Sequence, residues 1–271
     1  QGGRYMSYKF VELAISKHIA TVTMARIDAL NALSLEFAAE IARVFKEMGE
    51  NDDVRVVILC SKAKIFCAGL DLKEAASGDI SSVKGVLDTI KKAQPLFDCC
   101  NAIEECPKPV IAAVHGKCIG GGLDIISACD IRLCTEDAVF CLKEANIGLV
   151  ADMGVLQRLP LIIGQGFARE MAYTAANYPA RDVEKMGLVN NVYADQAGLM
   201  AAAQKLAAQI AANAPLAIKC TKEVLNFSRF VNTYEGMAMA VQKNASMMMT
   251  EDLKEAFMSF LERRPADFKG K

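Results

Sequence analysis

Histidine is scarce in this chain, which contains only His18 and His115 among its 271 residues. Histidine is the commonest side-chain ligand of transition metals, so two isolated residues exclude a histidine-rich metal site and a relay of histidines. His115 precedes Gly116, a setting typical of a turn or packing residue. We therefore expect no bound metal.

Long apolar runs and an excess of one charge are also missing. The apolar stretches are interrupted by Lys, Asp or Gly before they reach the ~20 residues that a membrane-spanning helix requires. Lys and Arg number 31 and Asp and Glu 32, a net charge of -1, so the chain has no general attraction for nucleic acid or anionic membranes. We expect a soluble globular protein without a membrane span or a nucleic-acid partner, which binds any anionic ligand by local groups.

The ten cysteines lack the paired C-x-x-C spacing that zinc sites use. Four lie in strand-like or helix-like stretches, where a thiol behaves as a small apolar residue: Cys60, Cys118, Cys129 and Cys141. Reduced thiols in a reducing compartment are therefore predicted. No G-x-S-x-G elbow is present, and Cys67 and Cys118 lack an obvious general base, so covalent catalysis is not expected.

Strand-like and helix-like segments alternate along most of the chain. Two β-rich runs, at 10–15 and 18–24, predict a hairpin, and an amphipathic helix is expected over 34–48. Further strands are predicted at 54–60, 110–114, 131–134 and 138–142, and further helices at 82–100 and 121–128. Repeated strand–helix units of this kind indicate an α/β fold with a large core.

The composition changes after about Gln196. Ala, Leu, Lys, Met and Glu dominate there, which predicts helices at 199–212, 216–227, 233–248 and 251–262. We divide the chain into an α/β core, residues 6–196, and a C-terminal helical region, residues 197–271, and take residues 1–5 as a tag or processing remnant. The helical region is too small for a core of its own, so its Met-rich apolar face is expected to dock on the core or on another subunit.

Two glycine-containing turns follow predicted strands. The first is Phe-Cys-Ala-Gly-Leu-Asp-Leu at 66–72, and in the second the triplet 120–122 opens a helix. Consecutive glycines are costly unless close backbone approach is required, and free N–H groups at a helix start favour negative charge, so each turn can donate one N–H to an oxyanion. A tight turn packed against a neighbour explains the glycines about equally well. Neither the G-x-G-x-x-G spacing of dinucleotide sites nor a P-loop is present.

Together, the string at 66–72 and His-Gly-x-x-x-Gly-Gly-Gly-x-Asp at 115–124 resemble the paired signatures of the enoyl-CoA hydratase/isomerase (crotonase) superfamily, and the similarity extends from about Tyr8 to Lys269. The resemblance implies a crotonase-like spiral of repeated ββα units with a helical C-terminal trimerisation region. It implies that the N–H groups of Leu70 and Gly121 hold a thioester oxygen, a contact worth on the order of 3 kcal/mol per donor in analogous sites. The residues implied to bind CoA are Ala68, Gly69, Leu70, Asp71, Leu72, Gly121 and, from an adjacent subunit of a trimer or hexamer, Phe260 and Arg263.

Three carboxylates follow the second turn in apolar surroundings: Asp124, Glu144 and Asp152. Asp152 can alternatively cap a segment that begins at Met153, whereas Asp124 lies just past glycines inside an apolar helix. Hydratases of the family carry Glu, Glu and Gly at these three positions, and dienoyl-CoA isomerases carry the Asp, Glu and Asp found here. The chain therefore resembles the Δ3,5-Δ2,4-dienoyl-CoA isomerases most closely.

That resemblance implies an enzyme that moves the double bonds of a 3,5-dienoyl-CoA to the 2,4 positions in the β-oxidation of unsaturated fatty acids. Asp152 would remove a proton from C2, protonated Glu144 would return one to C6, and Asp124 would orient and tune its neighbours. Three acids in an apolar pocket cannot all ionise cheaply, so at least one is expected to have a raised pKa. No cofactor is implied, since CoA is part of the substrate.

Two alternatives stay open from the sequence. Hydration or a Δ3 to Δ2 double-bond shift suits the same fold, although Asp at 124 and 152 favours the dienoyl reaction. A non-catalytic RNA-binding relative is disfavoured because the three carboxylates are intact and a basic stripe is absent. The family suggests a mitochondrial or peroxisomal-type organelle, although residues 268–271 do not match the Ser-Lys-Leu address.

Overall fold

The computed structural model describes residues 8–77 and 85–271, and a six-stranded sheet forms its centre. The strand order is β1-β2-β3-β4-β6-β9, with β1 antiparallel to β2 and every other neighbouring pair parallel. The strands are β1 (Val11–Ser16), β2 (Ile19–Met24), β3 (Val56–Ser61), β4 (Val110–Val114), β6 (Ile131–Thr135) and β9 (Asn191–Tyr193). A smaller sheet, in the order β5-β7-β8, consists of β5 (Lys117–Ile119), β7 (Val139–Cys141) and β8 (Tyr178–Pro179).

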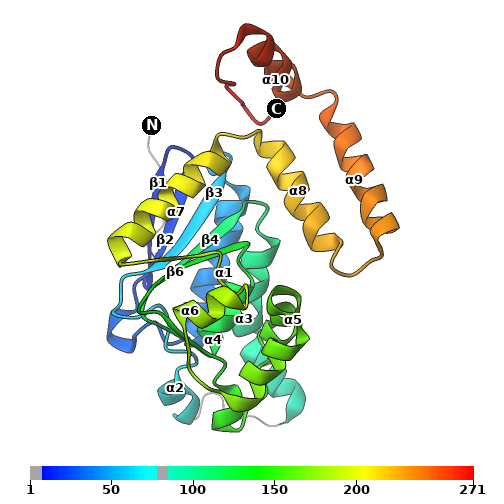
Figure 1. The fold of residues 1–271 in the computed structure, drawn as a ribbon. Helices are drawn as coiled ribbons and strands as arrows, with labels where there is room; N and C mark the ends of the chain where they lie inside the picture. The colour runs from blue at the N-terminus through cyan, green and yellow to red at the C-terminus, as the bar shows by residue number, and fades with distance from the viewer. Residues whose placement is uncertain (1–7, 78–84) are drawn as a thin grey trace.

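Helices cover both faces of the large sheet (Figure 1). The helices before the C-terminal region are α1 (Leu35–Glu50), α2 (Leu72–Ala76), α3 (Val86–Glu105), α4 (Gly121–Ser127), α5 (Val155–Thr174) and α6 (Ala180–Lys185), with the 3-10 turns η1 (Ile27–Ala29) and η2 (Glu144–Ile147). They are followed by α7 (Gln196–Ala211), α8 (Pro215–Phe227), α9 (Thr233–Met247) and α10 (Glu251–Glu262). Among the described residues, no helix is both long and apolar enough to cross a membrane.

Strand β3 shows why the sheet has two covered faces. All six of its residues are buried, and successive side chains point to opposite sides. Val57 and Leu59 join the core that contains the buried faces of α1 and α3, whereas Val56 and Ile58 pack in a second core with α7. A strand buried on both faces reads as a continuous apolar run, as predicted for parallel sheets.

The predicted α/β architecture is confirmed. The hairpin, the strand at 110–114 and the helix capped by Ser34, whose Oγ accepts the Phe37 N–H, are all present. The helix predicted at 82–100 begins at Val86 and ends at Glu105, and the first residues of that prediction, like residues 1–7, lie outside the described residues. Six elements were not predicted from the sequence: α2, α5, α6, β5, β8 and β9.

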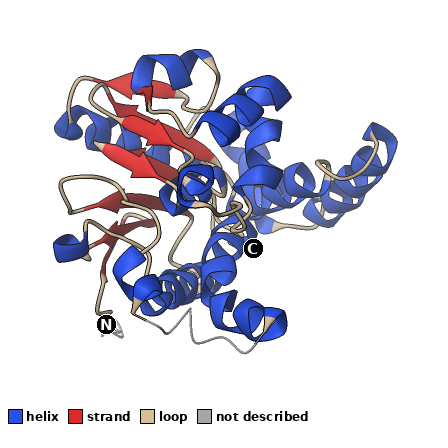
Figure 2. Ribbon diagram, turned by 90° about the horizontal axis from the view of Figure 1, so that it is seen from below, coloured by secondary structure: helices blue, strands red, loops and turns tan. Residues whose placement is uncertain are grey.

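The C-terminal region is helical, as predicted, but its parts differ in position. Helix α7 packs on the sheet through Leu199, Ala203, Ala207 and Ala211. Helices α8 to α10, here called the C-terminal arm (residues 215–262), extend away from the sheet (Figures 1 and 2). The division at residue 196 stays a prediction, with the first helix beyond it packed on the core.

Candidate active site

The two glycine turns meet beyond the carboxyl ends of β3 and β4. Cys67 and Cys118 form an isolated parallel bridge, in which the Ile119 N–H donates to the Cys67 carbonyl at 3.0 Å. Gly69 has φ +93°, and a Cβ there would lie 3.0 Å from the Ile119 carbonyl oxygen. The close approach of the two backbones therefore requires glycine at this position.

Each turn presents an unused N–H group. Leu70 is half-buried and Gly121 is buried, and within residues 8–77 and 85–271 neither backbone N–H donates a hydrogen bond. The Gly120 N–H is bonded to Cys141, and the N–H groups of Leu123 and Asp124 are bonded to the Gly120 carbonyl. Buried N–H groups are nearly always paired, so free ones on adjoining turns indicate a site for a ligand oxygen.

Glu144 brings a carboxylate to the same turns. It begins η2, and its Oε1 would lie 2.8 Å from a Cβ on Gly120. Its Oε2 is buried without a hydrogen-bond partner in the described part of the chain. Burial, followed by the charge of Asp152, raises the pKa of Glu144, so the carboxyl holds its proton more readily than an exposed glutamate.

Asp124 lies deepest of the three, at 1% exposure. Its Oδ1 accepts the Val155 N–H at 2.9 Å, at the start of α5. Burial, and then the charges of Glu144 and Asp152, raise its pKa to about 7. The predicted raised pKa is therefore present, and it is largest at Asp124 rather than at the proposed donor Glu144.

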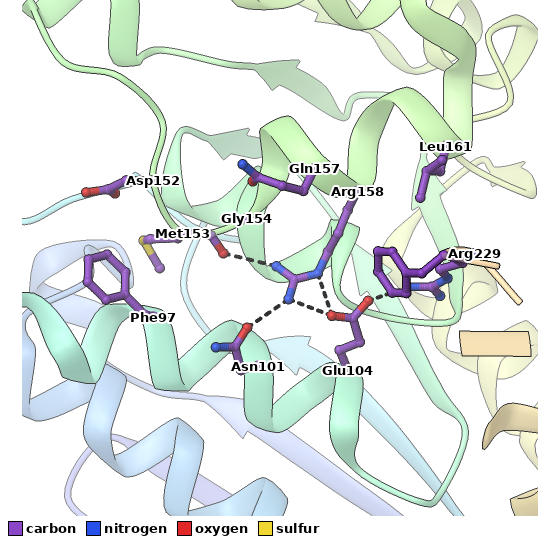
Figure 3. Close-up of a pocket in the computed structure, with 11 residues that line it drawn as sticks. Phe97, Asn101, Glu104, Asp152, Met153, Gly154, Gln157, Arg158, Leu161 and Arg229 are labelled. Atoms are coloured by element: carbon purple, nitrogen blue, oxygen red, sulfur yellow. Dashed lines mark hydrogen bonds and ion pairs between the residues drawn. The ribbon is translucent and has the colours of Figure 1, made fainter. Parts of the chain in front are cut away.

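Asp152 lies at the rim of a pocket of about 240 Å³ that Phe97, Met153 and Leu161 also line (Figure 3). Its side chain is more open to solvent than those of Asp124 and Glu144, yet burial raises its pKa as well. The capping alternative is wrong, because α5 begins at Val155 and the carboxylate that accepts the Val155 N–H belongs to Asp124. The structure thus brings the three predicted carboxylates within electrostatic range of one another.

The predicted CoA-binding loop lies along an open groove of about 1270 Å³. Ala68, Leu70, Asp71 and Leu72 line it, whereas Gly69 is buried beneath them. The Asp71 carboxylate is already occupied, since Oδ1 accepts the N–H groups of Lys73 and Glu74 and Oδ2 pairs with Arg26 at 2.7 Å. Asp71 therefore shapes the loop.

Phe260 and Arg263 do not join the site of their own chain. The tail after α10 contacts Arg55, just before β3, which donates to the Phe268 carbonyl at 2.6 Å. The glycine turns follow the opposite ends of the strands, and α10 and α2 lie at opposite ends of the molecule (Figure 1). Phe260 is 82% exposed, and its contact with CoA from an adjacent subunit stays a prediction.

Two arginines near the site were not predicted from the sequence. Arg26 anchors Asp71, and Arg158 contacts the loop that carries Asp152. The available signal for Arg158 was a single cation in the otherwise apolar start of α5. Among the described residues, no group of three or more His, Cys, Asp or Glu side chains is arranged to hold a metal ion.

The site places free N–H groups that can bind an oxyanion beside buried carboxyls that can exchange protons. The fold matches solved structures of enoyl-CoA hydratases: that from Bacillus anthracis superposes with a TM-score of 0.90 at 30% identity, over 97% of this chain and 100% of that one.

Comparison of the sequence with known families identifies the family of this chain. Residues 14–271 match the enoyl-CoA hydratase/isomerase family, and the chain belongs to it. The peroxisomal Δ3,5-Δ2,4-dienoyl-CoA isomerase of Arabidopsis thaliana is 38% identical over 97% of this chain and 98% of its own length. The mitochondrial Δ3,5-Δ2,4-dienoyl-CoA isomerase of Homo sapiens is 40% identical over 92% of this chain and 77% of its own length.

Proposed function

We propose that this chain is a Δ3,5-Δ2,4-dienoyl-CoA isomerase. The observation that carries the proposal is the gathering of Asp124, Glu144 and Asp152 beside the free N–H groups of Leu70 and Gly121. Relatives with that printed activity match nearly the whole chain, and their mitochondrial or peroxisomal names suggest an organelle for this one. CoA enters as part of the substrate, so no separate cofactor is proposed.

The reaction moves one proton and leaves the formula unchanged. The Asp152 carboxylate takes a proton from C2, and the electron pair spreads through the diene to the thioester oxygen. The N–H groups of Leu70 and Gly121 stabilise that dienolate, because they are fixed before charge develops. Glu144, whose pKa is raised by burial, delivers a proton to C6, and the 2,4-diene results. Asp152 then loses its proton to water and Glu144 takes one up from water, which restores both groups.

Asp124 has a different role in this scheme. It accepts a hydrogen bond from the Val155 N–H, and the charges of Glu144 and Asp152 help to raise its pKa. Because this repulsion is mutual, an ionised Asp124 also disfavours ionisation of the other two carboxyls. It therefore orients the start of α5 and biases the protonation of its neighbours.

The test is the spectrum of the pure protein with 3,5-dienoyl-CoA. Growth of the absorbance of the 2,4-dienoyl thioester supports the proposal. Parallel assays with 2-enoyl-CoA and 3-enoyl-CoA measure hydration and the Δ3 to Δ2 shift. Turnover of either at a higher kcat/KM than the dienoyl substrate would move the assignment to that reaction.

We also propose a homotrimer or a dimer of trimers, assembled through the C-terminal arm. The arm exposes large apolar side chains that a single chain leaves uncovered: Leu225, Tyr234, Met237, Val241, Met249, Phe257, Phe260 and Leu261. Patches of this kind mark association surfaces. Assembly would also let Phe260 and Arg263 of a neighbouring subunit reach CoA.

A further inference from the structure

Arg158 is a buried cation beside the loop that carries Asp152. It lies in the first turns of α5 and is 8% exposed. Its Nη1 donates to the Met153 carbonyl at 3.0 Å, and its Nη2 donates to Asn101 at 3.0 Å. Nε and Nη2 both donate to Glu104 Oε2, at 2.9 and 2.7 Å (Figure 3). A guanidinium with this fork of donors holds a fixed geometry.

The charge of Arg158 is met by Glu104 of α3 and not by Asp152. Figure 3 shows the Asp152 carboxylate pointing away from the guanidinium. Burial alone would raise the pKa of Glu104, but the hydrogen bonds and charges of Arg158 and Arg229 bring it below its usual value. Glu104 is therefore an ionised partner, and Arg158 acts on the loop through the Met153 carbonyl.

The loop after Asp152 is held from two sides. Gly154 has φ +107°, and a Cβ there would lie 2.0 Å from Arg158 Nη1, so the guanidinium packs directly on the loop backbone. One residue further on, the Val155 N–H is bonded to Asp124. The backbone on either side of Gly154 is thus fixed to Arg158 and to Asp124, and Asp152 precedes the first of these anchors.

Glu104 also receives contacts from the beginning of the C-terminal arm. Asn226 of α8 donates to the Glu104 backbone carbonyl at 3.2 Å, and Arg229, just beyond α8, pairs with Glu104 Oε1. One carboxylate therefore joins α3, α5 and the arm. A movement of the arm has a direct route through Glu104 and Arg158 to Met153.

We propose that Arg158, held by Glu104, is a positioning residue that fixes Asp152 for proton transfer, and that Arg229 extends this linkage to the C-terminal arm. The inference rests on the proposed function, because positioning of Asp152 matters only if its carboxylate takes the proton from C2. Displacing a catalytic group by about 1 Å costs about 10²-fold in rate. Arg158 itself does not touch the reacting atoms in this account.

The experiment compares Arg158→Met with Arg169→Met in the full chain, with 3,5-dienoyl-CoA as substrate. Arg169 lies in the second part of α5, beyond the kink at Gly164, is exposed, and bonds to Gln165 and Tyr173. We expect Arg158→Met to lower kcat about 10²-fold with KM nearly unchanged, and Arg169→Met to match the wild type. Arg229→Met is expected to lower kcat less, by about tenfold, because it loosens only Glu104.

Hydrogen exchange without substrate gives an independent readout. Amides of residues 150–157 should exchange about tenfold faster in Arg158→Met and at the wild-type rate in Arg169→Met. If Glu104, which loses Arg158 but keeps its pair with Arg229, prevents folding, Arg158→Met combined with Glu104→Gln is used for both measurements. A wild type inactive on 3,5-dienoyl-CoA would overturn the proposed function, while exchange would still test the loop. A folded Arg158→Met protein with unchanged kcat, whatever its thermal stability, would overturn the positioning role alone.

Discussion

The glycine-turn site and the C-terminal arm are incomplete in opposite ways. At the site, polar groups are hidden without partners: Glu144 Oε2 and the Gly121 N–H are buried, and neither is bonded within the described chain. On the arm, apolar groups are exposed: Met249 is 86% and Phe260 82% accessible. Hidden polar groups favour a polar ligand and exposed apolar groups favour a protein surface, so the two regions call for different partners.

The largest effect is expected when the proton-transfer groups of the glycine-turn site are removed. Asp152→Asn and Glu144→Gln should each lower kcat by about 10³-fold, because both transfers are required, and each should leave the affinity for CoA esters nearly unchanged. Steady-state kinetics and calorimetric titration with product measure the two effects. Retention of most dienoyl activity by Asp152→Asn, with loss in Glu144→Gln, would reduce the site to one working carboxylate and favour a simple enoyl-CoA isomerase.

Gly120 tests how tightly the site is built. Its φ of +48° and the 2.8 Å between an added Cβ and Glu144 Oε1 mean that Gly120→Ala both strains the turn and displaces the carboxyl. We expect about a 10²-fold loss of kcat. Gly166→Ala is the matched control: a Cβ there meets nothing within 4 Å, so activity should be unchanged. Equal activity of the two variants would refute the close packing of Glu144 on the turn.

On the arm, Phe260→Ala should raise KM for the acyl-CoA about tenfold and lower the proportion of trimer, since it removes a large apolar contact from a neighbouring subunit. Lys254→Ala, an exposed change on the same helix, is the control. Kinetics and light scattering over a dilution series measure both effects. A wild-type protein that is monomeric and fully active at micromolar concentration would contradict the role given to the arm.

The smallest expected effect concerns the pH dependence of stability. The folded state keeps a proton on Asp124 up to about pH 7, whereas the unfolded chain releases it near its ordinary pKa of 3.8. The folded state thus binds more protons between these values, and the free energy of unfolding falls as pH rises through that interval. The charged and titratable groups around Asp124 are the same in the wild type and in an Asp124→Asn variant: Glu144, Asp152, Arg158 and the buried thiols of Cys67 and Cys118.

Asp124→Asn cannot ionise, and its amide oxygen can still accept the Val155 N–H. Its stability relative to the wild type should therefore improve as pH rises from about 4 to about 7. Urea unfolding of both proteins over that range measures the difference. Parallel stability curves would show that Asp124 does not hold its proton in the folded state.

The elements with a local sequence pattern and the family with a specific signature could be predicted from the sequence. The continuous apolar run of β3 and the apolar face of α1 are local signals, and the strings at 66–72 and 115–124 indicated the family. Contacts between segments that are distant in the sequence could not be predicted. Asp124 to Val155 spans 31 positions and Arg158 to Glu104 spans 54, and no periodicity marks either pair.

The short elements were missed for a related reason. Strands such as β8, with two residues, are defined by their pairing and have too few residues to show a period. Docking of the helical region on the core or on another subunit was expected from the sequence, but the sequence did not distinguish α7, which packs on the sheet through Leu199 and three alanines, from the helices after it. Pairing with neighbouring strands, and not local preference, fixes the short strands.

The most direct test of the central claim, that two different carboxyls move the proton, follows hydrogen in a single turnover. The enzyme is equilibrated in D₂O, mixed with a limiting amount of 3,5-dienoyl-CoA and quenched, and the 2,4-dienoyl-CoA is analysed by NMR. If Asp152 removes the C2 proton and Glu144 supplies the proton at C6, the product carries one deuterium at C6. Transfer of the original C2 hydrogen to C6, without deuterium from solvent, would show one shuttling carboxylate and contradict the account.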